Sequence, residues 1–319
     1  MTAAGRQPQA CALPDRLHRY ETAVADSQRW DAYRPRPGDI IVVTAPKCGT
    51  TWTQMLCALL LHGPRLPAPL TRLSPWLDRL STPIEALVAE LDAQAGRRIV
   101  KTHTPLDGLP YFEAVSYVFC GRDPRDAFLS MMDNMKNTSA ATMAAVRQRL
   151  SLPDSFSFPT DANAFFPVWL TAPIHAWVED GFPTGSVFGT ARAFWPHRRL
   201  PNLHFTHYRD LTTDLEGELR RLAAFLGIRV APQVWPRLTE AASFAAMRAA
   251  ADQTAPGAHL GEWTDNAAFF ARARLGEWRT ALTAENQALY DEVAPTRVPP
   301  ALRAWLEGGR EAAGDPARL

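Results

Sequence analysis

The stretch APKCGTTW (45–52) places a cation, a glycine and two hydroxyl groups directly after a strongly apolar, β-branched run. Gly49 lets the backbone come close to a ligand, and Lys47 supplies positive charge. Thr50 and Thr51 add hydroxyl donors, and a helix that begins here adds free N–H groups at the positive end of its dipole. These groups favour an anion site, although an ordinary strand–turn–helix joint, in which a threonine caps the helix, has the same pattern.

A second candidate site follows another apolar run, RRIVKTH (97–103), in which Lys101 stands two residues before His103. A histidine can accept a proton near neutral pH, and a neighbouring cation lowers its pKa and keeps it neutral, as a general base must be. The alternative is a histidine that only hydrogen-bonds to the backbone. Of the 34 lysines and arginines only three are lysine, namely Lys47, Lys101 and Lys136, so the strand exits use compact cations either by chance or by need.

A third candidate site follows SYVFCGR (116–122), where Arg122 ends the run and Ser130 stands eight residues later. Asp123 suits the cap of the following helix and Pro124 its first turn. Arginine binds phosphate through paired hydrogen bonds, whereas the alternative is a surface arginine and a serine that faces solvent. Because ligands bind outside the carboxyl ends of parallel strands, the three sites together fit two anionic groups and one proton transfer.

The elements that must position these groups alternate along the chain. Strands are expected at 39–45, 97–103, 116–122 and 202–208, and helices at 50–63, 123–135, 164–180, 214–228, 233–249, 264–273 and 283–292, with an amphipathic segment at 83–95. This alternation predicts an α/β fold, a single domain with a central mostly parallel β-sheet flanked by helices. We divide the chain into an N-terminal lead-in (1–38), the domain (39–295) and a C-terminal extension (296–319).

Composition narrows the classes of partner and location. The 319-residue chain has a net charge of +1 and no basic tail, so we expect no nucleic acid partner. No run approaches the ~18 apolar residues of a membrane span, and we expect no membrane insertion. The N-terminal segment lacks the apolar stretch of a signal peptide, and the cysteines at 11, 48, 57 and 120 show no CxxC spacing. We therefore expect a reduced, cytoplasmic protein.

Other catalytic motifs are missing from the sequence. A Walker-type loop needs a Gly-Lys pair, which occurs nowhere, and GxGxxG, GxSxG and HExxH are also absent. His204 and His207 would point to opposite faces of a strand, so we expect no joint metal ligation. A nucleotide-dependent phosphotransferase and a non-catalytic binding protein on the same fold are the rival interpretations.

Six segments of the chain resemble, in family order, the motifs of the soluble (cytosolic-type) sulfotransferases that use 3′-phosphoadenylyl sulfate (PAPS). They run from about Arg36 to Tyr290 and are APKCGTTW, KTHTPLDGLP, YVFCGRDPRDAFLS, THYRDL with its helix ending in FLGI, ASFAAM and FFARARLGEWR. The resemblance implies a P-loop-like phosphosulfate-binding loop. It also implies an enzyme of EC 2.8.2 type that needs no metal and transfers a sulfuryl group to a phenol, alcohol or amine of a small-molecule acceptor, leaving adenosine 3′,5′-bisphosphate (PAP).

The resemblance further implies a role for each motif residue. His103 would be the general base, Lys47 would neutralise charge on the leaving oxygen, and Lys101 would hold a sulfuryl oxygen. The implied cofactor-binding residues are Lys47, Cys48, Gly49, Thr50, Thr51, Trp52, Arg122, Ser130, Tyr208, Ser243, Phe244, Phe270, Arg272 and Arg274. Trp52 and Phe244 would hold the adenine, with a core tryptophan as the alternative for Trp52. Arg122, Ser130 and Arg272 would take the 3′-phosphate.

The chain departs from the family pattern at three places. Cys48 replaces the usual loop serine and is a weaker hydrogen-bond partner, although its backbone N–H should still serve the anion. The family's Arg-Lys-Gly triplet is Ala271-Arg272-Ala273 here, so a 3′-phosphate contact is in doubt and Arg272 or Arg274 would replace it. The family's dimer motif lacks its terminal glutamate, Ala288 in this chain, and the oligomeric state is not predicted.

A group of aromatic residues is the candidate for the acceptor pocket. The group consists of Trp76, Phe156, Phe158, Phe165, Phe166 and Trp169. They would suit a phenol or a lipophilic alcohol, but aromatic residues at helix spacing more often belong to a core, and we favour that interpretation.

Overall fold

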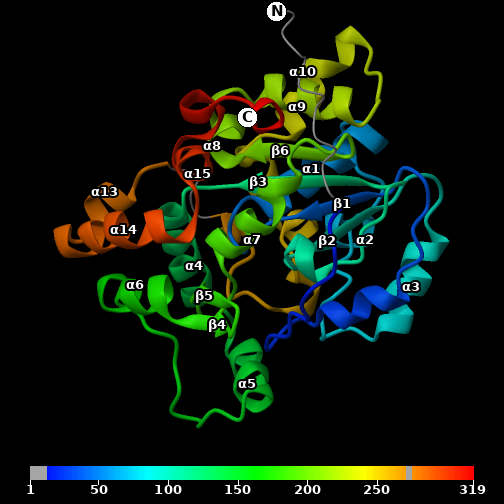
Figure 1. Ribbon diagram of the computed structural model, residues 1–319. Coiled ribbons are helices and arrows are strands. Elements are labelled where there is room, and N and C mark those ends of the chain that lie inside the picture. Colours follow the sequence, from blue (N-terminus) through cyan, green and yellow to red (C-terminus); the bar gives the residue numbers. More distant parts are fainter. Residues whose placement is uncertain (1–12, 271–274) are drawn as a thin grey trace, which may run out of the picture.

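The computed structural model describes residues 13–270 and 275–319, and at its centre is a four-stranded parallel sheet (Figure 1). The strands are β1 (Ile40–Val43), β2 (Ile99–Thr102), β3 (Ser116–Gly121) and β6 (Leu203–His207), in the order β2-β1-β3-β6. They are short and almost entirely buried, as strands covered on both faces are. The predicted parallel sheet is confirmed.

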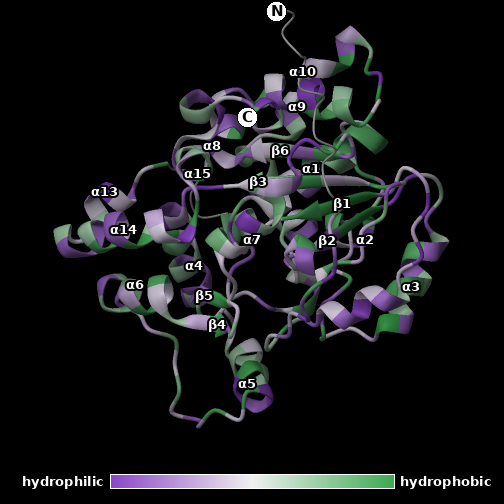
Figure 2. Ribbon diagram, in the orientation of Figure 1, coloured by the Kyte–Doolittle hydropathy of each residue, from purple (hydrophilic) through white to green (hydrophobic). Residues whose placement is uncertain are grey.

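Alternate strand residues enter two separate cores. Ile41 and Val43 belong to one buried cluster, and Ile40 and Val42 belong to the other. The hydrophobic character of β1 is visible in Figure 2. Both faces of the sheet are therefore covered, which gives a single α/β domain with three layers.

Helices on each face contribute to these two cores. The first core includes residues of α3 (Ile84–Ala93), α4 (Pro124–Lys136), α6 (Ala162–Thr171), α7 (Val187–Phe194), α13 (Trp278–Ala281), α14 (Ala284–Arg297) and α15 (Pro300–Ala313). The second includes residues of α1 (Thr50–His62), α2 (Leu70–Leu73), α8 (Tyr208–Thr213), α9 (Leu215–Phe225), α10 (Trp235–Ala241), α11 (Phe244–Ala249) and α12 (Ala251–Thr254). One further helix, α5 (Ala140–Arg149), lies away from the sheet at the bottom of Figure 1.

The strand register brings the candidate sites to one edge of the sheet. Val43 pairs with Thr102 on one side and with Phe119 on the other. The residues that follow these three positions, including His103 and Arg122, therefore leave the sheet on the same side. The helix after β3 begins as expected, because the Asp123 carboxylate accepts a hydrogen bond from the N–H of Arg125 at 2.9 Å.

Three helix predictions need correction. The segment 164–180 is helical only to Thr171, and an antiparallel hairpin of β4 (Pro173–His175) and β5 (Val178–Gly181) follows. Pro173 lacks an N–H and disfavours helical geometry at the residue before it, so the helix ends there. The segment 233–249 is divided into α10 and α11, because Ser243 caps a new helix. The segment 264–273 has only a short 3-10 turn at Ala267–Phe270 among its described residues.

Both ends of the described chain pack into the core, beyond the domain limits that we drew at 38 and 295. Those limits stay a prediction, but Trp30 and Tyr33 are buried, and α14 continues across residue 295. Trp305 of α15 is fully buried, and its ring packs against the rings of Phe119, Phe205, Trp195 and His207. Within the residues that the structure describes, no helix is both long and apolar enough to cross a membrane.

Trp305 also lies directly behind a strand exit. A Cβ added to Gly121 would lie 2.3 Å from the Trp305 ring, so the glycine lets α15 approach β3 just before Arg122.

We predict that Trp305→Ala lowers the free energy of unfolding by about 3–5 kcal/mol, because it removes a large buried side chain and leaves a cavity. Denaturant unfolding measures this loss. Trp177→Ala is the matched control, since Trp177 is 36% exposed, and it should cost clearly less. Similar losses in the two variants would contradict the central position of α15.

Candidate active site

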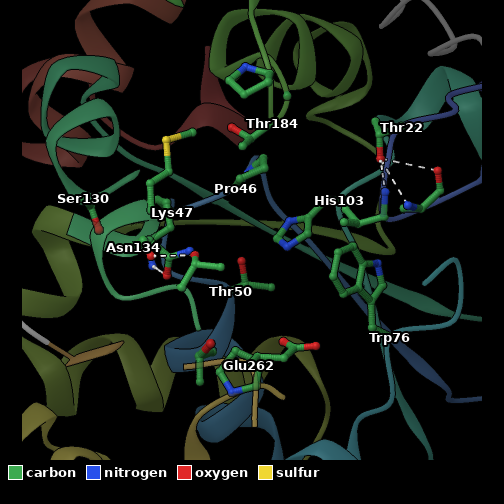
Figure 3. Close-up of a pocket in the computed structure, with 18 of the residues that line it drawn as sticks. Thr22, Pro46, Lys47, Thr50, Trp76, His103, Ser130, Asn134, Thr184 and Glu262 are labelled. Carbon is green, nitrogen blue, oxygen red and sulfur yellow. Dashed lines mark hydrogen bonds between the residues drawn. The ribbon is translucent and has the colours of Figure 1, made fainter. Parts of the chain in front are cut away.

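A cavity of about 710 Å³ lies at the carboxyl edge of the sheet and brings together groups from all three candidate sites. Lys47 and the start of α1 come from the first strand exit, Lys101 and His103 from the second, and Arg122 from the third. Figure 3 shows Lys47, Thr50 and His103 around the same space, with Trp76 beside the histidine. The expectation that the strand exits form one site is therefore met in the geometry.

The first turn of α1 is open toward this cavity. Gly49 occupies the cap position with φ +97°, and no side chain caps the helix. A Cβ at Gly49 would approach the Tyr208 ring to 3.0 Å, so both the backbone angle and the space require glycine. The first N–H groups of a helix have no partner within the helix, and Thr50 and Thr51 line the cavity beside them. This is the arrangement of an anion site at a helix N-terminus.

Cys48 contributes differently from what the sequence predicts. Its N–H donates to the carbonyl of Ala45 at 3.2 Å, and its thiol is buried in the core. Burial raises the pKa of the thiol to about 12. The expectation that the Cys48 N–H serves the anion is thus corrected, because the turn itself uses that group.

Lys47 has a partner that the sequence analysis missed. Its Nζ donates to Oδ1 of Asn134 at 2.9 Å and lies 4.2 Å from the ring centre of Phe269. Burial, and then the nearby charges of Arg122 and Lys101, lower the pKa of Lys47 to about 7. The signal for Asn134 was available, because it follows Ser130 by four residues and so lies on the same face of α4. Lys47 also has φ +65°, an uncommon backbone angle for a non-glycine residue that is often found at functional sites.

His103 is held as a neutral base. Its Nδ1 lies 2.8 Å from the carbonyl oxygen of Thr44, and a carbonyl only accepts, so Nδ1 carries the proton and Nε2 carries the lone pair. Burial is the main cause that lowers the pKa of His103 to about 3, and the charges of Lys101 and Lys47 contribute. A hydrogen bond to the backbone and a role as general base are therefore compatible for His103. The bond to the Thr44 carbonyl selects the tautomer that a base needs.

Lys101 lies beside the histidine. It is buried, and its Nζ lies 4.4 Å from the ring centre of Trp76, whose ring also meets the His103 ring edge to face at 5.0 Å. Burial, and then the charge of Arg79, lower the pKa of Lys101 to about 7. Arg79 itself forms an ion pair with Glu262, and both residues line the cavity although the sequence analysis did not select them.

Arg122 offers an unused donor. Its Nη1 donates to the carbonyl of Lys47 at 2.9 Å, and its guanidinium lies 4.0 Å from the ring centre of Tyr208. Its Nε is buried without a partner among the described residues, which leaves a donor for a ligand. Ser130 lines the same cavity as Arg122.

Aromatic residues form the wall next to the start of α1. Trp52, Tyr208, Phe244 and Phe270 line the cavity, and the Trp52 ring meets those of Tyr208 and Phe244 edge to face. Trp52 is largely buried, and its indole N–H donates to the carbonyl of Ala242 at 2.8 Å, so it is both a core residue and a cavity residue.

Three of the predicted cofactor-binding residues are not among those that the structure places at the cavity. Ser243 caps α11 by accepting from the N–H of Ala246, and it is not among the residues that line the cavity. Arg272 and Arg274 lie outside the described residues. Within the described ranges, no group of three or more His, Cys, Asp and Glu residues is placed to hold a metal ion.

The aromatic residues considered for the acceptor divide into two groups. Phe165, Phe166 and Trp169 are buried and pack around Phe128, so for these three the preferred core interpretation is confirmed. Trp76 and Phe158 line the cavity, and Phe156 packs against Phe158.

The residues present fit a ligand with two anionic groups and an adenine. The uncapped helix, the unpartnered Nε of Arg122 and the two lysines supply donors and positive charge at one end of the cavity, and the aromatic wall suits a flat base. These observations agree with the donor nucleotide that the sequence resemblance implies.

Comparison with known proteins gives the same result. A family model described as the sulfotransferase domain matches residues 37–298. A glycolipid sulfotransferase from Mycobacterium bovis is 39% identical over 308 residues, which cover 91% of this chain and 94% of the relative.

Solved structures share the fold. Mouse sulfotransferase SULT7A1 complexed with PAP has a TM-score of 0.62 at 20% identity, covering 86% of this chain and 89% of its own. Retinol dehydratase in a complex with retinol and PAP has a TM-score of 0.66 at 20% identity, covering 86% and 87%. At these identities the likeness concerns the fold.

The lowered pKa values of Lys47 and Lys101 predict that PAP binding at pH 8 takes up protons. With pKa values of about 7, both lysines are mostly neutral at that pH in the free protein, and the phosphate charges favour their ammonium forms. Calorimetry at pH 8 in two buffers of different ionisation enthalpy measures the uptake. It should be smaller in Lys47→Met and should fade at pH 6, where both lysines are already charged. Equal heats in the two buffers at pH 8 would refute the assignment.

Proposed function

The chain belongs to the sulfotransferase family, whose members use PAPS, and we propose that it transfers the sulfuryl group of PAPS to a hydroxyl group of a carbohydrate-bearing lipid. The acceptor class is supported by the glycolipid sulfotransferase that matches nearly the whole chain. It is a narrower class than the phenol, alcohol or amine expected from the sequence. The observation that carries the proposal is the position of His103, a neutral base in the same cavity as the uncapped end of α1.

His103 removes the acceptor proton. Its Nδ1–H is held by the Thr44 carbonyl, so Nε2 is the only ring atom with a lone pair for the hydroxyl proton. The proton that it accepts is stabilised only as negative charge develops nearby, which ties proton transfer to the group transfer.

Lys47 and Lys101 stabilise the negative charge that develops during the reaction. PAPS supplies a sulfuryl group whose bond to the bridging phosphate oxygen breaks as the acceptor oxygen bonds to sulfur, and PAP leaves. Lys47 neutralises the charge on the leaving oxygen, for which it must exchange its Asn134 partner for the phosphate. Lys101 holds a sulfuryl oxygen from the end of the neighbouring strand β2.

The donor nucleotide is held by groups from the first and third strand exits that line the cavity. The N–H groups of the first turn of α1, with the hydroxyls of Thr50 and Thr51, bind the 5′-phosphate. The Nε of Arg122 and the hydroxyl of Ser130 bind the 3′-phosphate. Trp52 and Phe244 contact the adenine.

We propose the cytoplasmic location that the sequence led us to expect. The three described cysteines, Cys48, Cys57 and Cys120, are buried and unpaired, which supports a reducing, cytoplasmic environment.

We predict that His103→Ala lowers kcat by about 10²-fold or more, the scale of general-base catalysis, and leaves the affinity for PAP nearly unchanged. Transfer from labelled PAPS to an alkyl glucoside measures turnover, and calorimetry with PAP measures binding and reports that the variant is folded. A variant that retains wild-type turnover would remove His103 from the mechanism.

A further inference from the structure

Asp78 is a fully buried carboxylate behind the wall of the cavity. It is not among the residues that line the cavity, whereas Thr104 is. Its Oδ2 accepts hydrogen bonds from the hydroxyls of Thr102 and Thr104, both at 2.5 Å. These two threonines are the residues on either side of His103 in the chain. The carboxylate therefore holds both neighbours of the base.

The threonines are also bonded to each other. The Thr102 hydroxyl accepts a hydrogen bond from the N–H of Thr104 at 2.9 Å, a contact over two residues that fixes the backbone in a turn. Because β2 ends at Thr102, His103 lies beyond the sheet ladder and needs this other support. We call Asp78, Thr102 and Thr104, with these three hydrogen bonds, the Asp78 network.

Asp78 is itself held by the backbone on both sides. The segment before it runs beside β2, where Lys101 donates its N–H to the carbonyl of Pro75 at 2.9 Å. Leu77 donates its N–H to the carbonyl of Lys101 at 3.3 Å. The carbonyl of Asp78 accepts the N–H of Asp26 at 2.9 Å. A side chain that positions another residue must be fixed in this way.

A carboxylate at this place is costly. Burial raises the pKa of Asp78, and the two threonine hydroxyls act against that shift. Apolar side chains of similar volume would fill the same space without the cost of burying a charge. The carboxylate supplies what they lack, an acceptor that binds two hydroxyl groups in fixed directions.

We propose that Asp78 is a positioning residue for the general base, an inference that rests on the proposed role of His103. Through Thr102 and Thr104 it sets the position of the His103 ring, so that Nδ1–H reaches the Thr44 carbonyl and Nε2 is left for the acceptor. Without the Asp78 network the ring loses this single orientation, and both tautomers become populated. Asp78 does not line the cavity, so it acts through the histidine.

Nuclear magnetic resonance of the protein labelled with 15N-histidine tests this network without any acceptor. Burial lowers the pKa of His103 to about 3, so the ring is neutral at pH 7 and the shifts of its two nitrogens report the tautomer. The signals of His103 are those that are missing from His103→Ala. The wild type should show the Nδ1–H form alone, and Asp78→Ala and Thr102→Val should show a mixture of the two forms.

Thr102→Val decides the test even where Asp78→Ala does not fold. Valine has the branched shape of threonine and suits a strand, so the variant removes the hydroxyl and little else. Thr102→Ser keeps the hydroxyl and should restore the single tautomer. A single Nδ1–H form in Thr102→Val would overturn the proposal.

Thr206→Val is the matched control. Thr206 is a buried threonine of β6 that donates to the buried carboxylate of Glu218 at 3.3 Å, and it does not line the cavity. The same substitution there should leave the signals of His103 unchanged. Equal effects of Thr102→Val and Thr206→Val would show a general loss of packing and overturn the proposal.

Sulfuryl transfer to an alkyl glucoside gives the second measurement. Thr102→Val should lower kcat by about tenfold, because a small displacement of a catalytic group is costly, and should leave the affinity for PAP unchanged. In a protein that already carries His103→Ala it should cause no further loss, since the network acts only through the base. An equal loss with and without His103 would indicate a merely structural role and overturn the proposal.

The two measurements separate this inference from the proposed function. Mixed tautomers without any loss of kcat support the Asp78 network and count against His103 as the base. Mixed tautomers in variants of a protein that sulfates no glucoside support the network and count against the acceptor class.

Discussion

The site depends on bringing three basic side chains close together at one edge of the sheet. Lys47, Lys101 and Arg122 each lie over an aromatic ring, at 4.2, 4.4 and 4.0 Å from the ring centres of Phe269, Trp76 and Tyr208. A ring face attracts a cation but does not take up its charge as a carboxylate would. The ring faces thus stabilise the positively charged side chains. The pKa values of the two lysines are nevertheless lowered, because burial disfavours their charged forms. The parallel register of β1, β2 and β3 places these three side chains at the same edge of the sheet.

Burial, and then the charges of the two lysines, keep the base neutral. A histidine between buried lysines is held neutral, and the carbonyl of Thr44 fixes which nitrogen is free. The base, the anion site and the acceptor opening are therefore parts of one electrostatic design.

The sequence predicted the parts of this design that are local in the chain. The four strands depend on short patterns and lie where the sequence predicts them. Short patterns also indicated Lys47, Thr50, Thr51, Lys101 and His103, which all line one cavity. What the sequence could not predict depends on distant contacts. Asn134 meets Lys47 from another helix, and Trp305 reaches the core from the last helix. The use of the Cys48 N–H by its own turn is a local contact that the sequence pattern did not reveal. The sequence did not predict the hairpin after α6, because apolar runs of that length fit both a helix and a strand. In the structure the helix ends just before Pro173, where the hairpin begins.

The account as a whole is tested most directly by a crystal structure of the protein with PAP and octyl glucoside. We predict that the phosphates contact the first turn of α1 and the Nε of Arg122, and that Lys47 has left Asn134. A glucoside hydroxyl should lie about 2.6–3.2 Å from Nε2 of His103, the distance at which a base can accept its proton. A complex in which PAP is bound but the glucoside hydroxyls lie beyond the reach of His103, or in which the phosphates bind away from α1, would contradict the account.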